Sequence, residues 1–348
     1  MGTIIREPIV KQGHARRASV SDVARAAHVS VGTVSNVLNR PDQVSPATRR
    51  RVEEAIKTLS FVRNGSARQL RAGTISAVGA IVLDIGNPFF TDLSRGIEAR
   101  LDERDLTLML ASSHEDSTRE ARYLRHFEEQ GILGVMVVPS SESTDYLLPL
   151  QERGVSVVLL DRHSQDQRIS SVSVDDVAGG SLAARHLIGL GHENIALLNG
   201  PHTIRQCADR SAGVVAALHD AGLDPAHALS EITIDTLNAA GGEEGISRAL
   251  RLSRRPTATF CVNDLVALGA LRKLRREGVS VPHGMAVVGY DDVDFAAELG
   301  TPLTSVRQPT FELGHRAASL VLPGSNDPTQ VIFQPELIVR SSSAGFDS

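Results

Sequence analysis

A segment close to the N-terminus, residues 19–39, constrains the fold most strongly: SVSDVARAAHVSVGTVSNVLN. It predicts two short amphipathic helices joined by a tight turn. Ser21 and Ser30 are the expected N-caps, because a side-chain oxygen at a helix start accepts backbone N–H groups that lack partners. The expected inward residues are Val23, Ala24, Ala27, Val29, Val34, Val37 and Leu38. This spacing is typical of a helix-turn-helix, whose second helix enters the major groove of DNA.

The charge distribution favours this interpretation over an ordinary helical hairpin, which the spacing alone would also permit. Residues 1–72 carry 13 Lys/Arg and 5 Asp/Glu, whereas the whole chain has 36 Lys/Arg, 41 Asp/Glu and a net charge of −5. A basic N-terminal segment followed by an acidic remainder of the chain is the pattern of a DNA-binding domain attached to another domain. The basic side chains expected to neutralise phosphates are Arg16, Arg17, Arg40, Arg49, Arg50, Arg51 and Lys57.

Length and composition set the outer limits of the fold. A chain of 348 residues exceeds one typical core, and 41% hydrophobic residues allow sizeable cores. The two cysteines, Cys207 and Cys261, provide neither a metal-binding nor a disulfide framework, so we expect reduced thiols in the cytoplasm and no bound metal. No apolar run is long enough for a membrane span, and residues 1–17, expected to be a flexible basic arm, lack the apolar core of a signal peptide.

The segment after the second helix continues the helical pattern. Ser45 is expected to open a third helix through about Leu59, with Val52, Ala55 and Ile56 facing inward. Residues 60–73 are a linker or a short helix. Such a short helix is marginal in water by itself and needs a partner.

From residue 76 the pattern changes to apolar strands alternating with helices such as 90–103 and 118–130. A first set of strand-like runs covers 76–84, 106–113, 134–140 and 155–161. A second set covers 171–176, 194–200, 231–235, 258–264 and 285–292, and a last strand-like stretch covers 330–340. Such runs predict parallel sheets covered by helices, and two sets predict two doubly wound lobes.

Several of these strands end in polar residues: Asp84, Asp161, Asp175, Asn263, Asp264, Asp291 and Asp292. In open α/β sheets, ligands bind beyond the carboxyl ends of the strands, so these groups are expected at a cleft between the lobes. Asp and Asn also cap the helices that follow strands. For Asp175, Asp264 and Asp292 we favour this capping role.

A series of motifs follows along residues 19–342: SDVARAAHVSVGTVSNVLN, VSPATRRRVEEAI, RNGSARQLRAG, DIGNPFF, HLIGLGHENIALLNGP, DRSAGVVAAL, VNDLVALGALR, VVGYDD and TPLTSVRQP. In this order, the motifs resemble those of the LacI/GalR family of bacterial transcription repressors. The resemblance implies an α/β protein with a three-helix head at 18–62, a hinge helix at 63–73 and a periplasmic-binding-protein-like core at 74–342. Its first lobe would cover about 74–170 and 305–330, and its second about 171–304 and 331–342.

The resemblance also implies which residues contact DNA. Val31, Gly32 and Asn36 match the variable base-reading positions, where Asn can bind adenine and Val can touch a thymine methyl. The further DNA contacts by this match are Ser21, Ser30, Thr33, Ser35, Asn39, Arg63, Asn64 and Ala67. Leu70 matches a leucine that, in paired hinge helices, wedges into the minor groove and kinks the duplex. Arg63 and Gly65 depart from the usual hinge pattern, so hinge folding is expected to depend on DNA.

An effector site is implied with less complete agreement. The matching positions are Phe89, Phe90, Asp161, Arg210, Leu237, Asn263 and Asp291. Carboxylate, guanidinium and amide groups supply the donors and acceptors that a sugar requires. Leu237 falls where an aromatic residue often stacks on the ligand, which leaves room for another small polar molecule. The implied partners are a palindromic double-stranded operator, a small effector such as a sugar, and a second copy of the chain, with no cofactor. No leucine heptad tail follows residue 340, so a dimer is expected rather than a tetramer.

Two other classes of function fit a doubly wound core: a sugar-modifying enzyme and a sugar-binding protein. The sequence has no Gly-rich phosphate loop, metal-ligand spacing or nucleophile elbow. His202 and Cys207 are close in sequence, but no third orienting group accompanies them. The basic head argues against a secreted binding protein.

Overall fold

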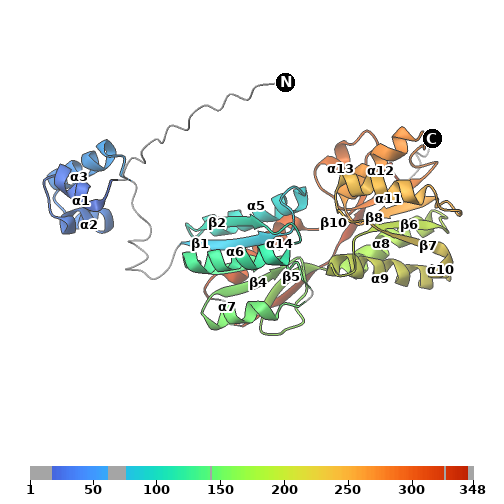
Figure 1. Cartoon of the computed structure of the whole chain (residues 1–348), viewed down its shortest axis with the longest axis horizontal. Helices are drawn as coiled ribbons and strands as arrows, with labels where there is room; N and C mark the ends of the chain where they lie inside the picture. Colours follow the sequence, from blue (N-terminus) through green and yellow to red (C-terminus); the bar gives the residue numbers. More distant parts are fainter. Residues whose placement is uncertain (1–17, 62–75, 142, 325–326, 344–348) are drawn as a thin grey trace, which may run out of the picture. The chain divides into compact units, whose positions relative to one another are not determined.

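The computed structural model describes residues 18–61, 76–141, 143–324 and 327–343. The chain divides into two compact units, residues 1–73 and 74–348. Figure 1 labels most of their helices and strands.

The first unit is a small helical head. Its helices are α1 (Val20–Ala26), α2 (Val31–Asn39), the 3₁₀ turn η1 (Pro41–Gln43) and α3 (Pro46–Thr58). Val23, Val34 and Val52 are fully buried, one from each α-helix. Phe61, which follows α3, is buried in the same core. The three predicted helices are therefore confirmed, and aliphatic residues at helical spacing hold them together.

The start of α1 differs from the prediction. Ser19 is the N-cap, and Ser21 is an exposed residue inside the helix. The Ser19 hydroxyl accepts a hydrogen bond from the Asp22 N–H at 3.3 Å, and the Asp22 carboxylate accepts one from the Ser19 N–H at 2.9 Å. This capping box satisfies two backbone donors, whereas Ala24, three residues after Ser21, offers no return bond. Ser30 caps α2 as predicted, accepting from the Thr33 N–H at 3.1 Å.

The second unit contains two lobes, each built on a six-stranded sheet. The first sheet has the order β2-β1-β3-β4-β5-β11, and all its neighbouring strands pair in parallel. Its strands are β1 (Ala77–Val82), β2 (Thr107–Ser112), β3 (Gly134–Val137), β4 (Ser156–Leu160), β5 (Ser170–Val174) and β11 (Gln330–Phe333). One face packs on α5 (Pro88–Asp102) and α14 (Thr310–Val321). The other packs on α6 (Ser117–Gln130), η2 (Asp145–Leu147) and α7 (Leu148–Glu152).

The second lobe repeats this architecture. Its sheet has the order β7-β6-β8-β9-β10-β12, parallel except for the β10–β12 pair. The strands are β6 (Ile195–Asn199), β7 (Leu229–Thr233), β8 (Ala258–Cys261), β9 (Ala286–Asp291), β10 (Thr304–Arg307) and β12 (Glu336–Ile338). Its helices are α8 (Asp176–Gly189), α9 (Arg205–Asp220), α10 (Pro225–Ala228), α11 (Ala239–Ala249), α12 (Asp264–Arg276) and α13 (Phe295–Glu298). The two doubly wound lobes predicted from the strand pattern are thus present.

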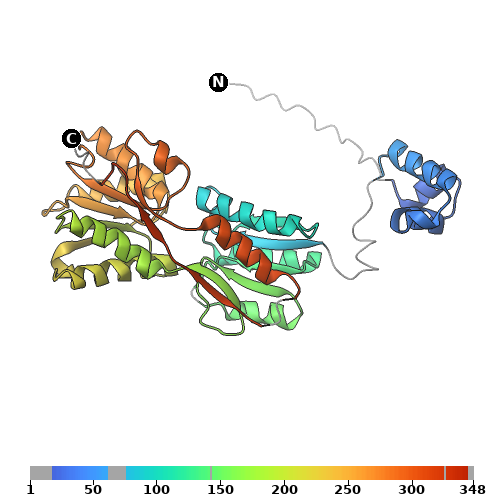
Figure 2. The ribbon, with the colours of Figure 1, turned by 180° about the vertical axis from the view of Figure 1, so that it is seen from behind.

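The chain crosses between the lobes three times, and the crossings differ from the expected boundaries. Strand β5, placed with the second set in the sequence, pairs with β4 of the first sheet. Strand β11 also joins the first sheet, whereas β10 joins the second. The crossings therefore follow β5, β10 and β11, where three segments run between the lobes in Figure 2. The expected boundaries at 170, 304 and 330 were displaced because an apolar strand pattern does not specify which sheet supplies its hydrogen-bond partner.

Within the described part of the chain, none of the helices has the length and apolar character needed to traverse a lipid bilayer.

Candidate functional site

The outward face of α2 carries the residues predicted to read DNA. Val31 is 49% exposed, and Gly32 and Asn36 are exposed beside it. Ser30 and Asn39 are also exposed, whereas Thr33 and Ser35 are half-buried. Ser30 is committed to the helix start, and the Asn39 amide donates to the Ser35 carbonyl oxygen at 2.8 Å. Asn36 carries the other exposed amide of α2.

The turn before α2 contains a residue with a strained backbone. His28, at the position where many such turns have glycine, has a left-handed conformation with φ 52°. A histidine tolerates this region at modest cost.

Four predicted DNA contacts, Arg63, Asn64, Ala67 and Leu70, lie outside the described residues.

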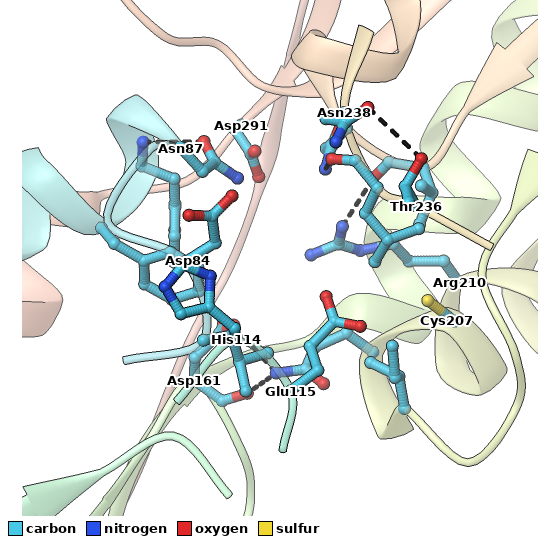
Figure 3. Close-up of a pocket in the computed structure, with 18 of the residues that line it drawn as sticks. Asp84, Asn87, His114, Glu115, Asp161, Cys207, Arg210, Thr236, Asn238 and Asp291 are labelled. Carbon is cyan, nitrogen blue, oxygen red and sulfur yellow. Dashed lines mark hydrogen bonds between the residues drawn. The ribbon is translucent and has the colours of Figure 1, made fainter. Parts of the chain in front are cut away.

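A cavity of about 250 Å³ lies at the carboxyl ends of the strands in the second unit, lined by residues from both lobes (Figure 3). The structure brings all seven residues predicted for the effector site to its wall: Phe89, Phe90, Asp161, Arg210, Leu237, Asn263 and Asp291. This position follows the rule for ligands in open α/β sheets. The volume is slightly below the roughly 300–1,000 Å³ of typical small-molecule sites.

Arg210 anchors the second-lobe side of the cavity. Its Nε donates to Asp176 Oδ1 at 2.8 Å, and its Nη1 donates to the Val262 carbonyl oxygen at 2.6 Å. The guanidinium carbon lies 3.6 Å from the centroid of the Tyr290 ring, whose hydroxyl donates to the same Asp176 oxygen at 2.8 Å. Both members of the ion pair are buried, which fixes the guanidinium as a rigid part of the wall.

Two glycines allow the helices that carry this ion pair to touch. A Cβ at Gly180 of α8 would lie 2.1 Å from the Arg210 carbonyl oxygen of α9. A Cβ at Gly213 of α9 would lie 2.0 Å from the Val177 carbonyl oxygen of α8. Side chains at either position would separate the helices, and with them Arg210 and Asp176.

Asp161 and Asp291 hold unusual backbone conformations at the cavity, with φ of 51° and 104°. Strained residues of this kind concentrate at functional sites. The Gln206 amide donates to Asp161 Oδ2 at 2.8 Å, and the Gln308 amide donates to Asp291 Oδ1 at 2.8 Å. Burial raises the pKa of Asp291 to about 7, against the lowering effect of Arg210. Burial likewise raises the pKa of Asp161 above its ordinary value.

The remaining predicted residues form a less polar wall. Phe89 and Phe90 make an edge-on ring contact with centroids 5.0 Å apart, and both are buried. Asn263 is the N-cap of α12, and its amide donates to the Leu237 carbonyl oxygen at 3.0 Å. Asn263 is thus both a cavity residue and a structural cap.

The capping roles favoured for three strand-end aspartates have mixed outcomes. Asp175 caps α8, accepting from the Ala178 N–H, as predicted. The prediction is wrong for Asp264, a buried residue that accepts from the Ser305 hydroxyl at 2.7 Å, because Asn263 already caps α12. It is also wrong for Asp292, which accepts hydrogen bonds from Arg307 and Arg340. Ser305 and Arg307 lie on β10 and Arg340 follows β12, so the partners come from distant segments that the sequence does not indicate.

Asp84, expected at the cleft as a strand end, lines the cavity as predicted (Figure 3). The sequence prediction did not include His114 and Glu115, which follow β2 at the same edge (Figure 3). The rule that placed Asp161 at the cavity applies to these two residues as well. Gln206 and Gln308 also line the cavity. Gln308 directly follows β10, whereas Gln206 lies on α9 and does not end a strand.

The geometry does not activate Cys207 as a nucleophile. Burial raises the pKa of its thiol to about 11, so the thiol stays protonated at neutral pH. His202 instead bonds to Glu231 at 2.7 Å. In the described residues, no group of three or more His, Cys, Asp or Glu side chains is placed to hold a metal ion.

Known proteins match both parts of the chain. Residues 19–64 match the family model "Bacterial regulatory proteins, lacI family", and residues 184–343 match "Periplasmic binding protein-like domain". The HTH-type transcriptional repressor PurR of Aliivibrio fischeri is 32% identical over 335 residues, which are 93% of this chain and 98% of PurR.

Two solved structures extend the similarity. The transcriptional regulator CelR in complex with cellobiose is 32% identical, with a TM-score of 0.68, covering 94% of this chain and all of CelR. The lac repressor dimer bound to operator and the anti-inducer ONPF is 25% identical, with a TM-score of 0.81, covering 95% of this chain and all of that one.

A helix-turn-helix head joined to a two-lobed core with a polar cavity defines a class of ligand-responsive, DNA-binding transcriptional regulators rather than enzymes. This chain belongs to the lacI family of bacterial regulatory proteins. Its relatives are helix-turn-helix transcriptional repressors, and this chain is a DNA-binding regulator of transcription.

Proposed function

We propose that the protein is a cytoplasmic repressor that binds a palindromic operator as a homodimer and responds to a small polar effector held between its lobes. The observation that carries this proposal is the cavity, to which both lobes contribute polar groups. A ligand bound there contacts Asp161 from the first lobe and Arg210 from the second, so its affinity depends on how far the lobes close. Binding can shift DNA affinity by the difference in affinity for the two arrangements, typically about 1–3 kcal/mol.

The effector is proposed to be a sugar or a related polyhydroxylated molecule. The carboxyl groups of Asp161 and Asp291, the amide of Asn263 and the guanidinium of Arg210 supply paired donors and acceptors for hydroxyl groups. Leu237 and the two phenylalanines supply an apolar surface for the ring faces. The relative CelR, whose structure contains cellobiose, supports this class of ligand.

The operator is proposed to be read by α2. Two heads of a dimer would each place α2 in the major groove of one half-site, so the symmetry of the site mirrors that of the protein. Val31, Gly32 and Asn36 face the bases in this proposal. The other predicted contacts of this region touch the DNA sugar-phosphate backbone or support α2 in this proposal: Ser21, Ser30, Thr33, Ser35 and Asn39.

The hinge proposal rests on family membership. Residues 63–73 would join the head at 18–62 to the core at 74–342, with Leu70 as the minor-groove wedge and Arg63, Asn64 and Ala67 as neighbouring contacts. Because the operator lies in the nucleoid, this role requires a cytoplasmic protein.

Substituting Asn36 tests the reading head. Asn36→Ala should lower discrimination at one base pair per half-site by roughly 1–3 kcal/mol, because it removes a bidentate contact to one base. Affinities for an operator and its single-base-pair variants, measured by fluorescence anisotropy, report this change.

The control is Arg50→Ala on α3, whose exposed side chain is suited to phosphate contact. This change should weaken all sequences by a similar factor and reduce the salt dependence of binding. If Asn36→Ala behaves like Arg50→Ala, with equal losses on every sequence, Asn36 does not read a base.

A further inference from the structure

We propose that the effector of this protein carries a positively charged nitrogen, as an amino sugar or a related polyhydroxylated amine does. This inference rests on the proposed function, because it specifies the ligand of the same cavity.

The charges that line the cavity are unbalanced. Five carboxyl side chains reach its wall: Asp84, Glu115, Asp161, Asp235 and Asp291. Among the described residues, the basic side chains on the wall are Arg210 and His114. Arg210 is already paired with Asp176 behind the wall, with side chains that are 7% exposed in both residues. Across the described part of the chain, none of the five carboxyl groups forms an ion pair within 4.0 Å, so each can pair with a cation bound in the cavity.

Two buried oxygens on the wall lack hydrogen-bond donors. Asp161 Oδ1 and Gln308 Oε1 have no partner in the structure, and these residues are only 5% and 4% exposed. The neighbouring atoms of both side chains are engaged: Asp161 Oδ2 accepts from Gln206, and the Gln308 amide nitrogen donates to Asp291. A buried acceptor without a donor destabilises the folded protein. A ligand that hydrogen-bonds to either oxygen must supply an N–H or O–H donor, which an ionised phosphate or carboxylate group lacks.

We place the positively charged nitrogen of the effector at the mouth of the cavity. Asp84 follows β1 and Glu115 follows β2, so two loops of the first lobe bring both carboxyl groups to the mouth (Figure 3). Partial burial, and then the neighbouring Asp84 carboxylate, raises the pKa of Glu115. Glu115 is also held in a left-handed conformation, with φ 61°. An ammonium group bound near these carboxylates would offset their mutual repulsion with an attractive contact.

Burial raises the pKa of Asp291 to about 7 and the pKa of Asp161 above its ordinary value, with Asp176 adding to the effect at Asp161. Burial therefore favours the neutral form of these two deeper carboxyl groups, whereas a bound cation would favour their ionised form. An organic cation fits this wall better than a metal ion, since no group of three or more metal-ligating side chains in the described residues is arranged around one point.

Matched pairs of small molecules test this inference on the full-length protein. The probes are D-glucosamine, D-galactosamine and D-mannosamine, each beside its neutral parent hexose and its N-acetyl derivative, together with glucose 6-phosphate. Thermal shift identifies binders and calorimetry measures their affinity. We expect at least one amine to bind at least tenfold more tightly than its parent and its N-acetyl derivative, and glucose 6-phosphate to bind more weakly still.

Substitutions test which carboxyl groups contact the ammonium group of the ligand. Glu115→Gln and Asp84→Asn should each weaken amine binding about tenfold or more while changing the affinity of a neutral hexose much less. The matched control is Glu129→Gln on α6, an exposed carboxylate outside the cavity, which should leave amine binding unchanged. Equal losses for charged and neutral probes in Glu115→Gln would contradict a contact with the ammonium group.

If a neutral hexose, an N-acetyl derivative or glucose 6-phosphate binds tightly and the matching amine binds no more tightly, the inference is overturned. The proposed effector site would remain intact in that case. Failure of every amine to bind also overturns it. The proposed function fails separately, if the protein does not recognise a palindromic DNA site.

Discussion

Arg210→Ala is expected to lower the free energy of unfolding of the core by roughly 3–5 kcal/mol. The substitution leaves the buried Asp176 carboxyl group without its cation, and it removes the contact of the guanidinium with the Tyr290 ring. Urea denaturation followed by circular dichroism measures the loss. Because the site is buried, the penalty comes mostly from the uncompensated carboxylate rather than from the lost attraction.

Two comparisons isolate the cause of this loss. Arg185→Ala removes an ion pair with Asp220 in the same lobe, but both side chains are more than 60% exposed, so the expected cost is below about 1 kcal/mol. A second comparison uses the single variant Arg210→Met, which also leaves Asp176 without its cation. The double variant Arg210→Met/Asp176→Asn removes both charges and should recover much of the stability that Arg210→Met loses. If Arg210→Ala costs no more than Arg185→Ala, the buried pair does not hold this side of the cavity together.

Asp291→Asn is expected to change how the stability of the ligand-free protein depends on pH. The pKa of Asp291 is raised from 3.8 to about 7 by burial. Between these values the folded protein holds a proton that the unfolded chain has released, so the free energy of unfolding falls as pH rises from about 4 to about 7. Each pKa unit corresponds to about 1.4 kcal/mol, so the loss is on the order of a few kcal/mol.

The asparagine variant keeps the hydrogen bond from Gln308 but cannot ionise. It should therefore lose stability less steeply over this range and be more stable than the unaltered protein at pH 7.5. Thermal unfolding of both proteins in a series of buffers gives the comparison. Parallel pH profiles would show that Asp291 ionises freely in the folded state.

Much of the architecture could be predicted from sequence because the signal was local. Val34 and Val37 of α2, like Val52 and Ala55 of α3, recur at helical spacing, and the cap at Ser30 precedes an apolar periodic segment. Strand β1 is a continuous apolar run, and β9 is apolar up to its last residue, Asp291, as expected for strands buried on both faces. The position of the cavity followed from where such strands end.

The parts that the sequence did not predict depend on contacts between distant segments. Strand β5 was assigned to the wrong lobe because nothing in Ser170–Val174 indicates that β4 is its partner. The Arg210–Asp176 pair joins residues 34 positions apart on α9 and α8, and only the packing of those helices brings them together. Ser19 was missed for a different reason. Its capping box was visible in the sequence, but Ser21 lay closer to the first predicted apolar residue.

Selection of bound sites from a random library of double-stranded DNA tests the central claim most directly, namely that this chain reads a palindromic operator. The full-length protein should enrich an inverted repeat, and its affinity for that repeat should fall steeply with salt because phosphate contacts contribute much of the binding. A scrambled repeat should bind at least a thousandfold more weakly. Failure to enrich any sequence, or enrichment of a site without two-fold symmetry, would contradict the account.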